Sequence, residues 1–306
     1  MADRTEQFAA LSTEARNPAS ESMDELSTVE LLRVINAADA EIAAAVAAEV
    51  PNIARAVDGI TERLGHGGRL FYIGAGTSGR LGVLDASECP PTFNVPPGLV
   101  QGIIAGGDSA LRTPAEQAED DPDQGAADLQ THGFTSRDAL VGIAASGRTP
   151  YVLGAMRWAR EAGALAIGLS CVPGSPLALA ADIAITPATG PEVLTGSTRM
   201  KAGTATKLVL NMLSTGVMIR TGCVYGNLMV NVQPTNAKLV DRAGRIIAAA
   251  TGCEPGTAAR LLAEAGSVKI AIAMIALELP RGAAESRLEA AGGNLRKALM
   301  ENATTE

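Results

Sequence analysis

Three short loops of this sequence combine glycine with serine and threonine, whose hydroxyls and nearby backbone N–H groups can bind an anion. The first loop, Gly74–Gly79, follows an apolar run and carries Thr77 and Ser78, near which a helix is expected to begin. The N-terminus of a helix favours a phosphate because its N–H groups are unpaired and its dipole is positive there. The loop also matches G-x-G-x-x-G, so a dinucleotide site is the alternative. That site needs an acid about 20 residues later, and the nearest acid after the next strand, Asp108, comes late.

The second loop, Ala144–Pro150, also follows an apolar run. Ser146 and Thr149 flank Gly147, which lets backbone N–H groups approach an anion, and Pro150 suits the first turn of a helix. Capping of that helix explains one hydroxyl, but it explains the pair and the glycine less naturally. We therefore interpret this segment as a second anion-binding loop.

The third loop, Thr195–Thr204, offers Ser197, Thr198 and Lys201 where another helix is expected to start, near Arg199. It is not a P-loop, because no Gly-Lys-Ser/Thr follows at the required spacing. The alternative is an exposed turn with a solvated Arg and Lys. Taken with the other two loops, it indicates a bound phosphate.

Glu88 is the first candidate for proton transfer. It stands just before the double proline that begins at Pro90, which should end the helix begun near Ser78. A carboxylate at a helix C-terminus faces the negative end of the dipole, which is unfavourable. Such a local misfit is typical of a functional residue; the alternative is a solvated glutamate at a helix end. Asp85, one turn earlier, is an alternative or a helper.

Glu119 is the second candidate. It follows Thr113–Glu116, a predicted capping box with Pro114 at the first helical position. Pro122 makes Asp121 an unfavourable helix residue, so the helix should end near Glu119. From the residues alone, Glu119 is equally a proton carrier or a solvated acid at a helix end.

Composition excludes several other classes of function. The two histidines, His66 and His132, lie in Gly-flanked turns, which gives little support to a His-rich metal site or a Ser-His-Asp triad. Four widely spaced cysteines are typical of reduced thiols in a cytosolic protein. A net charge of −8 without a Lys/Arg cluster, and 3% aromatic residues, argue against a nucleic-acid or anionic-membrane surface. The start of the chain is polar, and the longest lipid-like run, Ile270–Leu277, falls far short of the roughly 20 residues of a membrane span.

Short apolar runs alternate with helical stretches through the middle of the chain. Strands that are apolar on both faces and joined by helices form a parallel sheet with helices on both sides. The three loops would then meet at the edge where the strands end, which is where such sheets bind ligands. The predicted strands are Leu70–Ile73, Gly102–Ala105, Leu140–Ala144, Leu165–Leu169 and Ile183–Ile185.

The two ends of the chain are predicted to be helical. A loosely held polar arm covers residues 1 to about 24, and a capping box at Ser27–Glu30 opens a helix. Two Ala-rich helices follow, over roughly 38–49 and 51–64. Four helices are expected after residue 238, with breaks near Gly252, Gly266 and Pro280. The predicted domains are therefore 1–62, 63–226 and 238–306.

At these loops and glutamates the sequence resembles a known family. Gly-Thr-Ser after the first strand and Ser-Gly-x-Thr after a later strand resemble sugar isomerase (SIS) domains, which bind phosphosugars. Longer segments, from about residue 25 to the C-terminus, resemble the bacterial N-acetylmuramic acid 6-phosphate etherases. Those segments are Gly74–Thr92, Gly142–Tyr151, Thr195–Gly203, Lys207–Thr215, Gly226–Val230 and Ala250–Cys253.

The resemblance implies an SIS-type fold and a cytoplasmic homodimer that takes part in cell-wall sugar recycling. Such an enzyme converts N-acetylmuramate 6-phosphate and water into N-acetylglucosamine 6-phosphate and D-lactate, without a metal or redox cofactor. The family's catalytic glutamates fall on Glu88, as proton donor to the leaving oxygen, and on Glu119, as the base at C2. The expected phosphate and sugar ligands are Thr77, Ser78, Ser146, Thr149, Ser197, Thr198 and Lys201.

Three alternatives to an etherase can be tested. An aldose–ketose phosphosugar isomerase would also remove the C2 proton but would return it at C1 and release no lactate. A non-catalytic sugar-phosphate sensor would bind its ligand without turnover, and Glu88→Ala would leave its affinity intact. A dinucleotide oxidoreductase would bind NAD(P).

Overall fold

The computed structural model describes residues 13–300, whose central feature is a parallel sheet of five strands. Its order is β2-β1-β3-β4-β5, and β1 pairs with both β2 and β3. Every residue of β1 and β3 is buried, as the apolar runs predicted. The strands are β1 (Leu70–Gly74), β2 (Val100–Ile104), β3 (Ala139–Ile143), β4 (Leu165–Leu169) and β5 (Ile183–Ile185).

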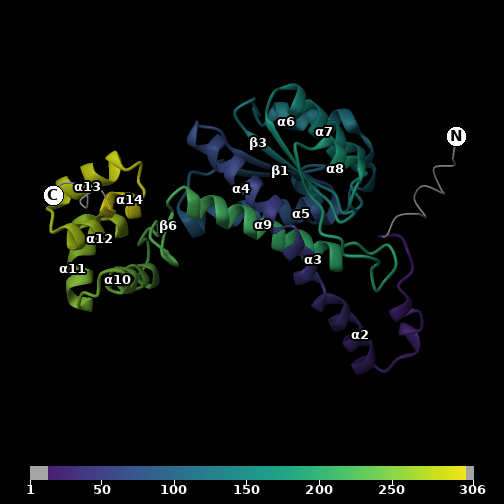
Figure 1. The fold of residues 1–306 in the computed structure, drawn as a ribbon, viewed down its shortest axis with the longest axis horizontal. Helices are drawn as coiled ribbons and strands as arrows, with labels where there is room; N and C mark the ends of the chain where they lie inside the picture. Colours follow the sequence, from purple (N-terminus) through teal and green to yellow (C-terminus); the bar gives the residue numbers. More distant parts are fainter. Residues whose placement is uncertain (1–12, 301–306) are drawn as a thin grey trace. The chain divides into compact units, whose positions relative to one another are not determined.

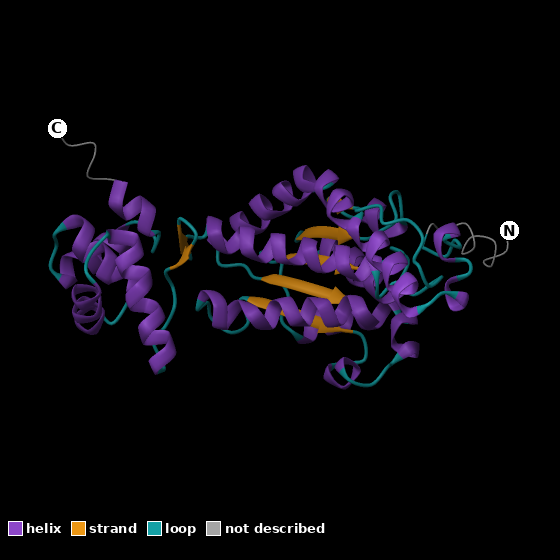
Figure 2. Cartoon of the chain, turned by 90° about the horizontal axis from the view of Figure 1, so that it is seen from below, coloured by secondary structure: helices purple, strands orange, loops and turns teal. Residues whose placement is uncertain are grey.

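Helices cover both faces of this sheet (Figures 1 and 2), which confirms the predicted three-layer α/β class. On one face Tyr151, Val152 and Met156 of α7 pack with Phe71 and Leu140 of the strands. On the other face α5 lies so close to the sheet that a Cβ at Gly82 would stand 3.0 Å from the Cβ atom of Tyr72. The helices of these layers are α4 (Val50–Gly65), α5 (Gly76–Phe93), α6 (Pro122–Thr131), α7 (Pro150–Glu161), α8 (Pro176–Ala180) and α9 (Lys201–Arg220).

The predicted N-terminal helices are present. Ser27 and Glu30 form the capping box of α2 (Thr28–Ala40), and α3 (Ile42–Ala48) leads into α4. Residues 1–12 of the predicted loose arm lie outside the described residues. The part from residue 13 contains two 3-10 turns, η1 (Pro18–Ser20) and η2 (Met23–Glu25), and Asn17 Nδ2 donates to the carbonyl of Pro191 at 3.3 Å. This part of the arm is therefore attached to the sheet domain.

The predicted end of α5 at Pro90 is wrong. The helix continues to Phe93 with Pro90 and Pro91 inside it, and Asn94 N donates to the carbonyl of Pro90 at 2.8 Å. Proline lacks an N–H donor, but its φ is compatible with a helix and its carbonyl still accepts a hydrogen bond. Glu88 thus lies five residues before the last residue of α5. The argument from an unfavourable dipole at the C-terminus does not apply to it.

The predicted capping box at Thr113–Glu116 is also wrong. The segment before Glu119 is instead a 3-10 turn, η4 (Glu116–Asp120), which has no side-chain cap. Asp121 caps the next helix, α6, by accepting hydrogen bonds from Asp123 N at 2.9 Å and Gln124 N at 3.1 Å. Pro122 fits the first position of α6, so the helix begins there rather than at Pro114. A further 3-10 turn, η3 (Asp108–Leu111), precedes this segment.

The chain divides into two compact units, of which the first contains residues 13–87 and 98–214 and the second contains residues 88–97 and 215–300. The second unit has a small hairpin, β6 (Val224–Tyr225) and β7 (Leu228–Met229), and helices with a core of their own. These are α10 (Ala237–Thr251), α11 (Pro255–Ala265), α12 (Val268–Leu277), α13 (Arg281–Ala290) and α14 (Leu295–Met300). The predicted domain boundaries stay a prediction.

The breaks predicted in this second unit fall where expected. Gly252 and Gly266 end their helices with left-handed φ angles of 74° and 69°, a conformation that glycine adopts without strain, and Pro280 precedes α13. The predicted number of four helices was wrong, because α14 forms after Asn294, whose side chain accepts from Lys297 N at 3.1 Å. No helix within residues 13–300 is long and apolar enough to cross a membrane.

Candidate functional site

A pocket of about 290 Å³ lies in the first unit at the ends of strands β1 and β3. The β1–α5 loop, the β3–α7 loop, the loop before α9 and the η4 turn all contribute to it. Six of the residues predicted from the sequence meet here, although they are spread over more than 120 positions of the chain. The lining residues are Glu14, Ala75, Gly76, Thr77, Ser78, Glu119, Ala144, Ala145, Ser146, Thr149, Gly196, Thr198, Gly203 and Thr206.

The first two loops present unused hydrogen-bonding groups to this pocket. Helix α5 begins at Gly76, so the N–H groups of Thr77 and Ser78 lie in its first turn, where no intrahelical acceptor exists. Thr149 occupies the N-cap position of α7, but its side chain makes no capping hydrogen bond. Capping of α7 therefore does not account for the hydroxyl of Thr149. Two helix N-termini and several hydroxyls can surround one phosphate.

The presence of glycine at position 147 of the second loop has a steric explanation. Its φ is +67°, and a Cβ at this position would lie 2.2 Å from Ser175 Oγ. Its N–H donates to the carbonyl of Ala144 at 2.9 Å, and its carbonyl accepts from Leu177 N at 2.9 Å. The close approach of α8 to this loop therefore requires glycine between Ser146 and Thr149.

The third loop is built differently from the prediction. The buried carboxylate of Glu192 accepts from Lys201 N and Ala202 N, each at 2.9 Å, and so occupies the N-terminus of α9. The ammonium group of Lys201 is buried beside the Pro191 carbonyl and lies 3.8 Å from Glu41 Oε2. Neither Lys201 nor Ser197 lines the pocket, whereas Thr198 does. The sequence signal that was missed is Glu192 itself, nine residues before the helix start.

The two predicted proton carriers are placed differently. Glu119 is exposed at the wall of the pocket and also lines an adjoining cavity of about 200 Å³. Glu88 lies in the second unit, on the exposed side of α5. Glu88 is exposed in the single chain and lies inside the helix rather than at its end.

Asp85, the predicted alternative or helper, is a buried carboxyl group. Its Oδ1 accepts from Asn211 Nδ2 at 2.6 Å and from Ser214 Oγ at 3.2 Å, and Tyr72 also hydrogen-bonds to the carboxyl group. Burial raises the pKa of Asp85, while these hydrogen bonds oppose the shift. The residue joins β1, α5 and α9 within the first unit.

Glu14 is a pocket residue that sequence reasoning missed. Its carboxylate lines the pocket, and a Cβ at Gly196 would lie 3.2 Å from its Oε2. It belongs to the arm that was expected to be loose, and no motif around it suggested a site. The pocket lining thus includes Glu14 and Glu119 but no Lys or Arg. An anion in this pocket would be held by hydroxyls and helix dipoles.

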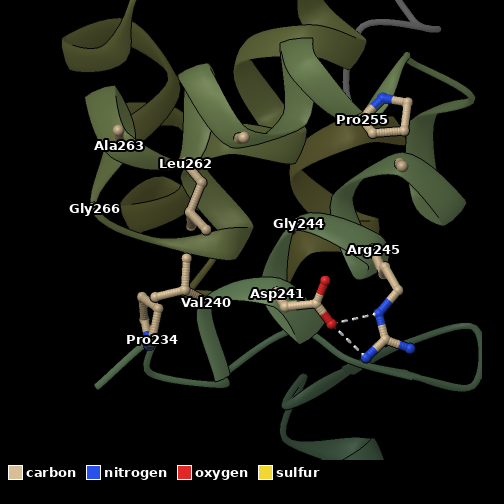
Figure 3. Close-up of a pocket in the computed structure, with 11 residues that line it drawn as sticks. Pro234, Val240, Asp241, Gly244, Arg245, Pro255, Leu262, Ala263 and Gly266 are labelled. Atoms are coloured by element: carbon tan, nitrogen blue, oxygen red, sulfur yellow. Dashed lines mark hydrogen bonds and ion pairs between the residues drawn. The ribbon is translucent and has the colours of Figure 1, made fainter. Parts of the chain in front are cut away.

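A larger cavity of about 500 Å³ lies in the second unit between α10 and α11 (Figure 3). It is lined by small and apolar residues such as Val240, Ala259 and Leu262. Its acidic group, Asp241, is paired with Arg245, whose Nη2 lies 2.7 Å from the Asp241 Oδ2 atom (Figure 3). None of the predicted site residues lines it, so its chemistry does not match that of a phosphosugar site.

None of the four cysteines forms a disulfide within the described residues. Cys89, Cys171 and Cys223 are buried and Cys253 is partly buried. Burial raises the pKa of the Cys171 thiol to about 12. Within residues 13–300 no group of three or more His, Cys, Asp and Glu side chains is arranged to hold a metal ion.

The fold and the rim of loops define a class of protein, the SIS domain. Models of this domain match the chain twice, as the "glucokinase regulatory protein N-terminal SIS domain" over residues 52–160 and as the "SIS domain" over residues 125–216. A solved structure from Bacteroides fragilis, described as a proposed phosphosugar isomerase involved in capsule formation, has the same fold. It aligns with a TM-score of 0.51 and 21% identity, and the match covers 66% of this chain and 95% of that chain.

Full-length relatives define the family. The chain is 58% identical over 287 residues to the N-acetylmuramic acid 6-phosphate etherase of Aeromonas hydrophila subsp. hydrophila, a match that covers 94% of this chain and 96% of the relative. It is 54% identical over 290 residues to the enzyme of the same name from Caldanaerobacter subterraneus subsp. tengcongensis, covering 94% and 95% of the two chains. The chain belongs to the N-acetylmuramic acid 6-phosphate etherase family.

Proposed function

We propose that this protein cleaves the D-lactyl ether of N-acetylmuramate 6-phosphate, with water as the second substrate, to give N-acetylglucosamine 6-phosphate and D-lactate. The observation that carries the proposal is identity of 54–58% over almost the whole length of relatives with this name. The pocket at the strand ends, with its hydroxyls and helix N-termini, supports it. The cytoplasmic location that the resemblance implies is part of the same proposal.

The reaction proceeds by elimination and hydration. In the open-chain sugar the C2 proton is acidic because C2 adjoins the aldehyde, and the lactyl ether at C3 is β to that carbonyl. Glu119 removes the C2 proton, and the electron pair forms a C2–C3 double bond as the C3–O bond breaks. Glu88 protonates the departing lactate oxygen. Water then adds its oxygen to C3 and a proton returns to C2, so that both glutamates regain their starting states.

The phosphate is bound by the rim of the pocket. Ser146 and Thr149 at the start of α7 bind the phosphate oxygens, while Thr77 and Ser78 at the start of α5 bind the phosphate or the sugar hydroxyls. Thr198 completes the ring of hydroxyls. Ser197 and Lys201, which do not line the pocket, shape the third loop in this proposal rather than contact the substrate.

The length of α5 bears on which subunit supplies each glutamate. Thr77 and Glu88 are eleven residues apart on one continuous helix, which corresponds to about 16 Å along its axis. A phosphate held at the helix N-terminus lies beyond Thr77, which lengthens this separation. Five covalent bonds of about 1.5 Å join the phosphorus to C3, a span of at most about 7.5 Å. This span is shorter than the separation along α5, which supports a site that takes Glu88 from another chain.

We therefore propose a homodimer in which each site combines Glu119 of the chain that holds the phosphate with Glu88 of the partner subunit. Exposed apolar side chains on α5 and α9, Leu84 and Met212, support an interface on this side of the first unit. A two-fold axis would complete both sites at once, because each chain gives and receives one glutamate.

The test of the reaction uses N-acetylmuramate 6-phosphate in heavy-oxygen water, with mass analysis of both products. We expect label at C3 of the aminosugar and unlabelled D-lactate. Label in the lactate would contradict cleavage of the C3–O bond. Formation of a ketose without lactate would indicate the isomerase, and binding without turnover would indicate the sensor. Titration with NAD(P) tests the dinucleotide alternative.

A further inference from the structure

A cavity of about 200 Å³ adjoins the phosphate pocket and is lined by one cationic side chain, Arg80, and one acidic side chain, Glu119. It shares Ala75, Gly76, Thr77 and Glu119 with the phosphate pocket, so the two spaces meet at these residues. Its other lining residues come from α5, the end of β2 and the segment that leads to η4. They are Arg80, Ala105, Ala110, Pro114 and Ala115. The cavity, here called the Arg80 cavity, thus combines methyl and methylene surfaces with one guanidinium group, and Glu119 lies where it meets the phosphate pocket.

Arg80 uses only part of its five N–H donors in hydrogen bonds within the protein. Its Nε donates to the carbonyl of Leu111 at 3.1 Å, and its Nη2 donates to the carbonyl of Ala110 at 2.8 Å. Among the side chains that the structure describes, no carboxylate forms an ion pair with Arg80 and no group accepts a hydrogen bond from its Nη1. The side chain is half-buried. A partly buried cation without a counter-ion beside a site for an anionic sugar favours a second anion on the ligand.

We propose that Arg80 binds the carboxylate of the substrate's lactyl group, so that the Arg80 cavity is the subsite for the leaving group. This inference rests on the proposed function. The substrate has two anionic groups, and the phosphate pocket, with hydroxyls and helix N-termini but no Lys or Arg, suits the phosphate. The lactyl group consists of a methyl and a carboxylate on one carbon. The alanine side chains and the guanidinium of the Arg80 cavity match those two groups.

The position of Glu119 agrees with this orientation. It lines both spaces, and the C2 proton that it removes is adjacent to C3, which carries the lactyl ether. A sugar with its phosphate in the first pocket and its lactyl group in the Arg80 cavity therefore has C2 and C3 at their boundary. Arg80 would also distinguish this substrate from phosphosugars that lack the lactyl group, because their binding leaves the guanidinium without a partner.

The test is a cycle in which the charge is removed from the protein and from the ligand in turn. The ligands are N-acetylmuramate 6-phosphate and the 3-O-isopropyl ether of N-acetylglucosamine 6-phosphate, in which a methyl replaces the carboxylate. Binding is measured by calorimetry in the Glu119→Gln background, where turnover is blocked. The variants are Arg80→Gln, which keeps an amide donor for the Ala110 and Leu111 carbonyls, Arg80→Lys, and Arg112→Gln, a matched control at an exposed arginine.

We expect Arg80→Gln to weaken binding of the lactyl ether by about 10- to 100-fold, the range for a hydrogen bond to a charged group. Binding of the isopropyl ether should not change, and Arg80→Lys should restore part of the preference for the carboxylate. Arg112→Gln should change neither ligand's affinity. Lactate release by the wild-type enzyme is measured in parallel.

Equal weakening of both ethers by Arg80→Gln would overturn the inference, because Arg80 would then act only by holding the Ala110–Leu111 segment. Unchanged binding of the lactyl ether would overturn it as well. Both results leave the proposed function intact as long as the wild-type enzyme releases lactate. Absence of lactate release by the wild-type enzyme would instead overturn the proposed function and this inference together.

Discussion

The proposal that each site takes its two glutamates from different chains can be tested by mixing two inactive variants. Glu88→Ala removes the proton donor and Glu119→Ala removes the base, so each homodimer should lose activity by orders of magnitude. In our proposal a site takes Glu119 from the chain that binds the phosphate and Glu88 from its partner subunit. A dimer of one Glu88→Ala chain and one Glu119→Ala chain therefore has one site with both glutamates and one site with neither.

The expected recovery follows from this arrangement. When equal amounts of the two variants exchange subunits at random, about half of the dimers are mixed, and each mixed dimer has one intact site out of two. About a quarter of wild-type activity should return. The assay is release of D-lactate from N-acetylmuramate 6-phosphate, measured before and after exchange. Mixing with excess Glu88→Ala/Glu119→Ala double mutant is the matched control, because no combination with it contains a complete site.

Two results would refute the reasoning. If both glutamates act within one chain, every chain in the mixture lacks one of them, and activity stays at the background after exchange. A mass-labelled preparation, which shows that mixed dimers have formed, makes that negative result decisive. If either single variant is folded and nearly fully active by itself, the assignment of that glutamate is wrong.

Three further changes test other parts of the structure. Ser146→Ala should weaken binding of the phosphorylated sugar by about tenfold or more, since it removes a hydrogen bond to a charged group, while binding of the unphosphorylated sugar, measured by calorimetry, should not change. Asp85→Asn should flatten the dependence of the melting temperature on pH. The raised pKa of Asp85 makes the folded state less stable as the pH rises from the ordinary pKa of a carboxyl group through the raised pKa in the folded protein. Equal slopes of melting temperature against pH in the wild type and the variant would contradict this. Glu192→Gln should lower the free energy of unfolding in urea by about 1–3 kcal/mol, because a neutral amide replaces the buried carboxylate that accepts from Lys201 N and Ala202 N.

The sheet was predictable because each strand is an uninterrupted apolar run. Buried parallel strands need apolar residues on both faces, and the run before Gly74 and the run before Ala144 show this directly. Once the strands are parallel, the loops that follow them must share an edge. The meeting of Thr77 with Ser146 at one pocket therefore follows from local sequence patterns alone.

The errors arose where a local rule competed with a longer-range interaction. Pro90 removes a hydrogen bond from α5, but the following turn continues because the proline carbonyl accepts from Asn94. Lys201 was predicted to face the phosphate, but Glu41 and the Pro191 carbonyl, distant in sequence, surround its ammonium group. The capping rule for Thr113 was satisfied in sequence, yet Asp121 next to Pro122 provided the better helix start. Propensity rules describe a segment by itself and do not include such partners.

The distribution of charge in the proposed homodimer explains why a rim of hydroxyls suits this site. A phosphate, a lactyl carboxylate and two glutamates would place several negative groups near one sugar. The pocket itself has no Lys or Arg, so helix N-termini and hydroxyls would bind the phosphate, and the guanidinium nearest to this pocket lies in the adjoining Arg80 cavity. In the proposed homodimer, Glu88 on α5 of one chain acts at the site of the partner subunit. Catalysis should therefore fall when the enzyme is diluted below the dissociation constant of the dimer, while each separate chain keeps its phosphate pocket.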